Sequence, residues 1–152
     1  MNRTRLKVMK IFEDAKLPQY ATEKSAGADL FAYIDNEDGE DYVIIYPGKT
    51  IVIGTGLKIQ PEDGFACYIS ARSGLATKRG LRPANCRGIC DEDYRGEYKV
   101  ALHNDSDQPQ LVVHGDKIAQ LEVCPYWQAD FEEVTSLDDT ERGTGGFGST
   151  GV

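Results

Sequence analysis

The sequence predicts an all-β domain, either a barrel or a sandwich, with one short helix. Short runs of β-favouring residues recur at close intervals along most of the chain, and clusters of Gly, Pro, Asn and Asp separate them. Only one stretch has the composition of a helix. The length of 152 residues fits a single domain that can bury enough surface to fold without a disulfide or a structural metal.

Each expected strand is rich in Val, Ile, Leu, Tyr or Phe and is bounded by turn residues. These strands are expected at residues 6–12, 28–33, 42–46, 50–59, 65–71, 98–104, 110–115 and 117–127. The intervening segments at 46–49, 60–64 and 104–107 supply the Pro, Gly, Asn and Asp that tight turns require.

The helix is expected at residues 73–79, SGLATKR, with Ser73 as its N-cap and basic residues toward its C-terminal end. Free backbone amides at a helix start attract anions, so Arg72 and Ser73 are candidates for binding a phosphate. The alternative is that Ser73 only caps the helix and that Arg72 is an ordinary surface cation.

The formal net charge is −8, from 25 acidic and 17 basic residues. This charge argues against nucleic acid and against an anionic membrane as partners. A small anionic substrate stays compatible with it, because a local group of arginines and amides can bind phosphate inside an acidic protein. The sequence contains no run of signal-peptide or membrane-spanning type, so a cytoplasmic location is expected.

The cysteines are then expected to be reduced thiols, buried as small apolar side chains. They are Cys67, Cys86, Cys90 and Cys124. A zinc site is not expected, since no CxxC pair occurs and both histidines are isolated in the sequence.

The chain divides into a body at residues 1–140 and a glycine-rich tail at 141–152. The tail composition is that of a disordered terminus. It also fits a lid over a nucleotide, since Arg142 and the hydroxyls of Ser149 and Thr150 can bind phosphate oxygens and Phe147 offers a flat face to a base.

Acidic residues at 91–93 lie between apolar residues in an apparent hairpin. In a regular strand Asp91 and Asp93 share one face, where a carboxylate held near water and a phosphorus centre can act as a general base. Asn85 and Tyr94 offer the amide and the aromatic face that a nucleoside pocket needs. The alternative is an acidic turn in solvent.

Two shorter segments add polar residues to apolar surroundings. Gln120 lies within an apolar strand at 117–127 and needs a polar partner if it is buried. Asp29 is either an exposed loop acid or a support for a basic residue or a metal-bound water.

Taken in order, five segments resemble the five sequence motifs of the trimeric dUTPase family. They are AGADL (26–30), ARSGLA (71–76), GICDEDYRG (88–96), DKIAQLEV (116–123) and RGTGGFGSTG (142–151). The chain departs from the family pattern at Ala71, where proline is usual, and at Arg87 and Cys90, where aliphatic residues are usual. The resemblance spans nearly the whole chain.

The resemblance implies a jelly-roll-like β-barrel that assembles as a homotrimer with active sites shared between subunits. It implies hydrolysis of dUTP to dUMP and pyrophosphate, which limits uracil incorporation into DNA and supplies dUMP for dTMP synthesis. By the same resemblance Asp91 activates the water that attacks the α-phosphorus, and Tyr94 packs under the deoxyribose where a 2′-hydroxyl would clash.

The other site residues implied by the resemblance have four roles. Asn85 and the backbone around Ile89 and Lys99 recognise uracil; Arg72, Ser73, Gly74 and Gln120 hold phosphates and water; Asp29 supports the site; and Arg142, Phe147, Gly148, Ser149 and Thr150 close over the nucleotide. Mg²⁺ is expected to arrive with the substrate phosphates and waters, with no side chain assigned as a direct ligand.

Two other functions are compatible with parts of this pattern. A dCTP deaminase would share the fold and release ammonia, but the glycine-rich tail with Arg142 and Phe147 favours a dUTPase. A regulatory protein that only binds nucleotide is the other alternative. The intact set of Asp91, Tyr94, Arg72 and Ser73 favours an enzyme.

Overall fold

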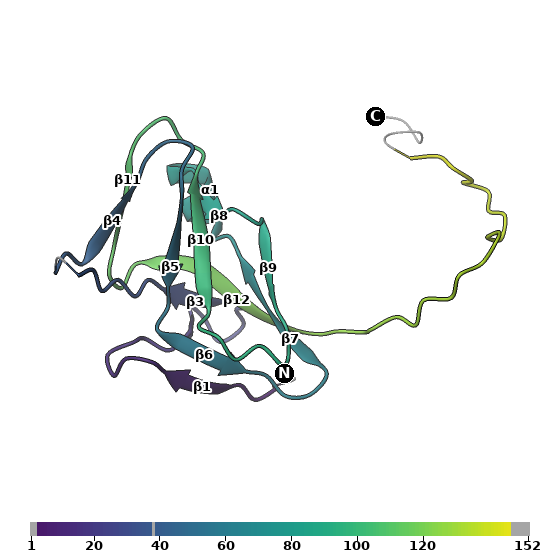
Figure 1. Ribbon diagram of the computed structural model, residues 1–152, viewed down its shortest axis with the longest axis horizontal. Helices are drawn as coiled ribbons and strands as arrows, with labels where there is room; N and C mark the ends of the chain where they lie inside the picture. Colours follow the sequence, from purple (N-terminus) through teal and green to yellow (C-terminus); the bar gives the residue numbers. More distant parts are fainter. Residues whose placement is uncertain (1–2, 38, 147–152) are drawn as a thin grey trace.

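The computed structural model describes residues 3–37 and 39–146. This part of the chain gathers into one body, and a long C-terminal segment leads away from it (Figure 1). The strands are β1 (Lys7–Lys10), β2 (Gln19–Tyr20), β3 (Ala28–Phe31), β4 (Tyr42–Ile45), β5 (Thr50–Gly54), β6 (Leu57–Gln60), β7 (Phe65–Ser70), β8 (Leu81–Pro83), β9 (Arg87–Cys90), β10 (Lys99–Asn104), β11 (Gln110–Val113) and β12 (Lys117–Pro125). The helix is α1 (Ser73–Arg79).

The strands pair in antiparallel sheets around a shared core. The largest sheet has the order β2-β3-β12-β7-β9, a second has the order β5-β10-β8, and β1-β6 and β11-β4 form two-stranded sheets. Each sheet contributes to the core, where Ile45, Leu57, Leu102 and Leu121 are at most 2% exposed. Burial of these apolar side chains is the main driving force for folding. The prediction of an all-β fold with one short helix is confirmed.

The expected strand at 50–59 is two strands, which pair with different partners. β5 pairs with β10, whereas β6 pairs with β1. The chain changes direction at Gly56, whose φ of 68° lies in the left-handed region that favours glycine. The hydroxyl of Thr55 donates a hydrogen bond to the Tyr98 carbonyl at 2.6 Å and fixes this corner.

The prediction of Ser73 as the N-cap of α1 is wrong by one residue. Ser73 is the first helical residue, and Arg72 occupies the N-cap position with extended backbone and no capping bond from its side chain. The chain leaves β7 in an extended conformation through Arg72, whose guanidinium is turned to Asp29 instead. The helix is therefore placed by its connection to β7 and not by a serine cap.

The cysteines are all free, but they do not share one environment. Cys67 and Cys90 are buried as expected, and burial raises the pKa of the Cys90 thiol to about 11. Cys86 departs from the expectation because it lies exposed in a turn with a φ of 60°.

The segment that follows β12 lies away from the body (Figure 1). Three of its large apolar side chains are almost fully exposed, with Trp127 at 96%, Phe131 at 97% and Leu137 at 87%. In the described residues, no helix has the length and apolar character needed to cross a membrane.

Candidate functional site

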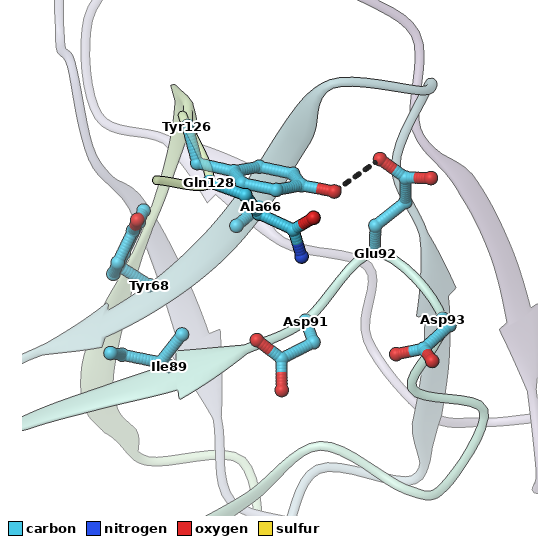
Figure 2. Close-up of a pocket in the computed structure, with 8 residues that line it drawn as sticks. All are labelled: Ala66, Tyr68, Ile89, Asp91, Glu92, Asp93, Tyr126 and Gln128. Atoms are coloured by element: carbon cyan, nitrogen blue, oxygen red, sulfur yellow. Dashed lines mark hydrogen bonds between the residues drawn. The ribbon is translucent and has the colours of Figure 1, made fainter. Parts of the chain in front are cut away.

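A surface pocket of about 570 Å³ lies where β9 ends. The residues that line it are Ala66, Tyr68, Ile89, Asp91, Glu92, Asp93, Tyr126 and Gln128. Asp91 directly follows β9, and Figure 2 shows its carboxylate directed into the space enclosed by these side chains. The pocket therefore offers an exposed carboxylate beside apolar and amide groups.

The residues after Cys90 form a turn instead of the regular strand on which the shared face of Asp91 and Asp93 depended. The Tyr94 amide donates to the Asp91 carbonyl at 3.1 Å, which closes the turn. Asp91 and Asp93 nevertheless both line the pocket. The turn thus presents both acids without continued strand geometry.

Glu92, between these two acids, is tied to other parts of the chain. Its Oε2 accepts a hydrogen bond from the Gly64 amide at 2.7 Å and another from the Tyr126 hydroxyl at 2.9 Å. These bonds, first the one from Gly64, lower the pKa of Glu92, and the same carboxylate raises the pKa of Tyr126. Figure 2 shows the bond between Tyr126 and Glu92 at the edge of the pocket.

The loop that follows holds the ring of Tyr94. Its hydroxyl donates to the Glu97 carbonyl at 3.0 Å, and its ring lies 5.9 Å from that of Tyr98, centroid to centroid. A Cβ at Gly96 would collide with the Tyr94 hydroxyl, so only glycine fits beneath it. The Glu97 carboxylate accepts from the Gly56 amide at 2.9 Å and pairs with Lys99 at 3.3 Å.

The apparent hairpin expected around Asp91 is not formed, because β9 pairs with β7, whereas β8 and β10 belong to another sheet. Asn85 lies in the turn between β8 and β9, and Ile89 lies on β9. A Cβ added at Gly88 would come within 3.2 Å of the Asn85 amide nitrogen, so the absence of a side chain there lets the Asn85 amide approach. Ile89 is 65% exposed on β9. The expected recognition residues Asn85 and Ile89 therefore lie close to Asp91 in the sequence, along one short stretch of chain.

A second group of polar residues surrounds Asp29 on β3. Asp29 is only 2% exposed and accepts from the Arg72 Nε at 2.8 Å and from the Lys117 Nζ at 2.8 Å. Burial alone would raise the pKa of Asp29, but the hydrogen bonds and charges of Lys117 and Arg72 outweigh it and hold the pKa below its usual value. Of the alternatives for Asp29, the structure shows a carboxylate that holds basic residues.

Gln120 lies in the same region because of strand register. It is opposite Asp29 on β3 and opposite Ser70 on β7. It is half-buried, and a Cβ at Gly27 would lie 3.3 Å from its own Cβ. Ser73 and Gly74, at the start of α1, follow Arg72 directly. Asp29, Arg72, Ser73, Gly74 and Gln120 therefore form one cluster, here called the Arg72 cluster.

One chain does not bring the Arg72 cluster to Asp91. The β7–β9 ladder runs from Cys67 opposite Cys90 to Ser70 opposite Arg87. Asp91 lies just beyond one end of this ladder and Arg72 just beyond the other. They are separated by about six residues along β7, or roughly 20 Å at about 3.3 Å per residue.

The tail residues also lie apart from both groups in this chain. Arg142 is in a turn, where its Nε donates to the Gly145 carbonyl at 2.8 Å, and the segment that carries it leads away from the body (Figure 1). The expected lid residues Phe147, Gly148, Ser149 and Thr150 lie outside the described residues.

Comparisons with known proteins identify the family that the five motifs resemble. The sequence profile of the dUTPase family matches residues 13–151. The chain belongs to the dUTPase family. The deoxyuridine 5'-triphosphate nucleotidohydrolase of Desulfitobacterium hafniense is 46% identical over 155 residues, which cover 100% of this chain and 99% of the relative. The protein of the same name from Nautilia profundicola is 45% identical, covering 97% of this chain and 99% of the relative.

The fold agrees with solved structures of the same family. The structure of a G164S mutant dUTPase of Staphylococcus bacteriophage 80alpha with dUpNHpp matches with a TM-score of 0.84. The match covers 97% of this chain and 99% of the phage protein at 24% identity. The expected dUTPase-like fold is therefore confirmed.

Three residues of this dUTPase family member take part in the two groups although the sequence analysis assigned them no role in the site. Lys117 shares the carboxylate of Asp29, and its place within the fourth motif was the only signal for it. Glu92 lies within the third motif, but its partner Tyr126 lies outside all five motifs. Among the described residues, no group of three or more His, Cys, Asp or Glu side chains could hold a metal ion.

Proposed function

We propose that this chain hydrolyses dUTP to dUMP and pyrophosphate at sites that subunits of a homotrimer share. The observation that carries the proposal is the separation of Asp91 from the Arg72 cluster by the length of β7. A base that activates water has to lie within hydrogen-bond reach of that water, next to the phosphate that other residues hold. A second copy of the chain can bring its Arg72 cluster to the Asp91 of the first.

The proposed substrate is supported by the curated relatives, which are named as deoxyuridine 5'-triphosphate nucleotidohydrolases. The uracil edge is read by Asn85 and by the backbone around Ile89 and Lys99. The ring of Tyr94 packs under the deoxyribose, and its bond to the Glu97 carbonyl fixes the ring in that position. A rigid ring at this place excludes a ribose with its 2′-hydroxyl.

Asp91 takes a proton from a water molecule as the water oxygen attacks the α-phosphorus. The bond between the α-phosphorus and the bridging oxygen breaks, and pyrophosphate leaves with that oxygen. Arg72, Ser73, Gly74 and Gln120 hold the phosphates and the attacking water. Because Asp29 uses only the Nε of Arg72, the terminal nitrogens of the guanidinium remain for phosphate oxygens.

Mg²⁺ would be held through the substrate phosphates and waters, which are the ligands it prefers, with no side chain assigned as a direct ligand. When bound, it neutralises charge on the triphosphate. The chain itself supplies cations through Arg72 and, after closure, Arg142. Asp29 is occupied by Arg72 and Lys117 and therefore supports the site without binding metal.

The body at 1–140 carries both groups, and the tail at 141–152 serves as a lid. Arg142, Ser149 and Thr150 bind phosphates, whereas Phe147 covers uracil and Gly148 allows close approach of the backbone. Closure of such a segment excludes bulk water from the reacting phosphate. The free cysteines fit the reducing environment of the cytoplasm, where we place the enzyme. We propose neither nucleic acid nor a membrane as its partner.

The test of this proposal is Asp91→Asn, which keeps the shape and hydrogen bonding of the side chain but removes the base. We expect binding of dUTP to persist and turnover with Mg²⁺ to fall about a hundredfold or more. The matched control is Asp107→Asn, in the exposed loop between β10 and β11, which should turn over normally. Near-normal turnover of Asp91→Asn, or release of ammonia from dCTP by the wild type, would contradict the proposal.

A further inference from the structure

Three segments that are distant in the sequence are joined by hydrogen bonds beside the Asp91 pocket. The Gly64 amide donates to the Glu92 carboxylate at 2.7 Å, and the Tyr126 hydroxyl donates to the same oxygen at 2.9 Å. The Tyr126 amide in turn donates to the Gly64 carbonyl at 3.2 Å. The turn before β7, the turn after β9 and the end of β12 therefore form one closed ring of contacts, here called the Glu92 clamp.

The turn that carries Asp91 depends on such polar contacts because it is little buried. Asp91, Asp93 and Tyr94 are exposed, and Cys90 is the last buried residue before the turn. Figure 2 shows Glu92 extended toward Tyr126, away from the side chain of Asp91. Glu92 therefore anchors the backbone of the turn without occupying the space into which the Asp91 carboxylate points.

Tyr126, the partner of Glu92 in the clamp, lies at the end of the folded body. Tyr126 directly follows β12, and Trp127, the next residue, is 96% exposed. Tyr126 is thus where the C-terminal segment leaves the body. A contact between Tyr126 and Glu92 connects the root of this segment to the turn of the proposed base.

We propose that Glu92 is a positioning residue for the hydrolysis of dUTP, which fixes the turn that presents Asp91 by binding the Gly64 amide and the Tyr126 hydroxyl. The inference rests on the proposed function, because it needs Asp91 to be the general base. Glu92 itself makes no contact with substrate. The clamp is needed because the general base must be held in an accurate position. A general base acts only within hydrogen-bond reach of its proton, and a displacement of about 1 Å can cost roughly a hundredfold in rate.

The clamp can be opened by Tyr126→Phe, which removes one hydroxyl and keeps the ring. We expect the single-turnover rate of dUTP hydrolysis to fall about tenfold, while KM and the melting temperature stay close to the wild type. Tyr46→Phe is the matched control, because Tyr46 lies at the surface and its hydroxyl makes no hydrogen bond to a described residue. This control should be indistinguishable from the wild type.

Variants of Glu92 separate a positioning role from a merely structural one. Glu92→Ala should lower the rate more than Tyr126→Phe, since it removes both bonds, and Glu92→Gln should recover part of the loss because its amide oxygen still accepts. The double variant Tyr126→Phe/Glu92→Ala should be no slower than Glu92→Ala alone, since the two residues share one bond. Faster amide hydrogen exchange at Gly64 in Glu92→Ala should accompany the loss.

The wild type is assayed first, so that the two proposals can fail separately. Absence of dUTP turnover in the wild type overturns the proposed function. Given turnover, a wild-type rate for Tyr126→Phe, or losses that add in the double variant, overturns the role of the clamp. If the variants also melt at a clearly lower temperature and bind dUTP with a raised KM, then Glu92 has a general structural role. That result overturns the positioning role as well.

Discussion

Asp29 is almost fully buried on β3, yet it stays charged because two cations share its carboxylate. Arg72 Nε and Lys117 Nζ each lie 2.8 Å from one of its oxygens. Burial opposes ionisation, but these partners prevail and lower the pKa of Asp29 below its ordinary 3.8. The carboxylate in turn fixes the direction of the Arg72 guanidinium. Asp29, which supports the site without touching substrate, therefore sets the position of Arg72, which binds phosphate in the proposed function.

A lowered pKa in the folded state means that Asp29 stabilises the protein above its unfolded pKa, and that this contribution is lost as the pH falls through the folded value. Asp29→Asn should lower the free energy of unfolding at pH 7 by about 2 kcal/mol, because Arg72 and Lys117 lose their counterion but keep some contact with water. Urea unfolding from pH 7 to pH 3 checks this. In the wild type, protonation of Asp29 contributes to the fall in the free energy of unfolding at acid pH. Asp29→Asn should lack this contribution, whereas Asp107→Asn should keep it. Identical curves for Asp29→Asn and the wild type would show that the buried pair has no net effect.

At the scale of single elements, α1 shows what ends a short helix. Gly80 follows it with a φ of 66°, and its amide donates to the carbonyls of Ala76 and Leu75. The same glycine packs tightly against the next loop, since an added Cβ would lie 2.8 Å from the Ser106 nitrogen. The residue therefore meets two requirements, a left-handed backbone and a close approach.

Gly80→Ala should lower the free energy of unfolding by about 2–3 kcal/mol, from backbone strain of about 1 kcal/mol and from the collision with Ser106. Gly48→Ala isolates the first contribution, because Gly48 has a φ of 69° and no atom lies within 4 Å of its added Cβ. Chemical denaturation of both variants gives the difference. Equal losses would mean that the loop moves to accommodate the methyl group at Gly80.

The sequence predicted the elements where a local pattern determines them, and failed where pairing does. The helix at 73–79 and the long runs at 65–71 and 117–127 follow from composition and turn residues. The split at Gly56 does not, because both halves of 50–59 favour β-strand and only their different partners separate them. In the site, Asp91, Tyr94 and Arg72 lie in recognisable motifs. The contact of Glu92 with Tyr126 joins a motif to a residue outside the motifs, so only the three-dimensional structure reveals it.

At the scale of the whole molecule, one chain holds two incomplete halves of the proposed site. The turn with Asp91 and Tyr94 and the cluster with Arg72 lie at opposite ends of the β7–β9 ladder. In a ring of identical subunits, one end of each chain faces the other end of its neighbour. Each proposed site then needs Asp91 from one chain and Arg72 from another, and defects in these two residues can be separated by mixing chains.

Mixed trimers of Asp91→Asn and Arg72→Gln should therefore regain activity that neither variant has alone. When the chains are unfolded together in equal amounts and refolded, about a quarter of the sites receive both intact residues by random assortment around the ring. The measurement is dUTP turnover of the mixture against the mean of the two separately refolded variants. The matched control is a mixture of Asp91→Asn and Tyr94→Ala, whose altered residues belong to the same turn. Every site in that mixture carries one defect, so its activity should not exceed the mean of its parents.

Sedimentation should give a species of three times the 16.8 kDa chain mass in both mixtures. A mixture of Asp91→Asn and Arg72→Gln that stays at the mean of its parents would mean that a single chain completes the site, and that the separation along β7 closes in some other way.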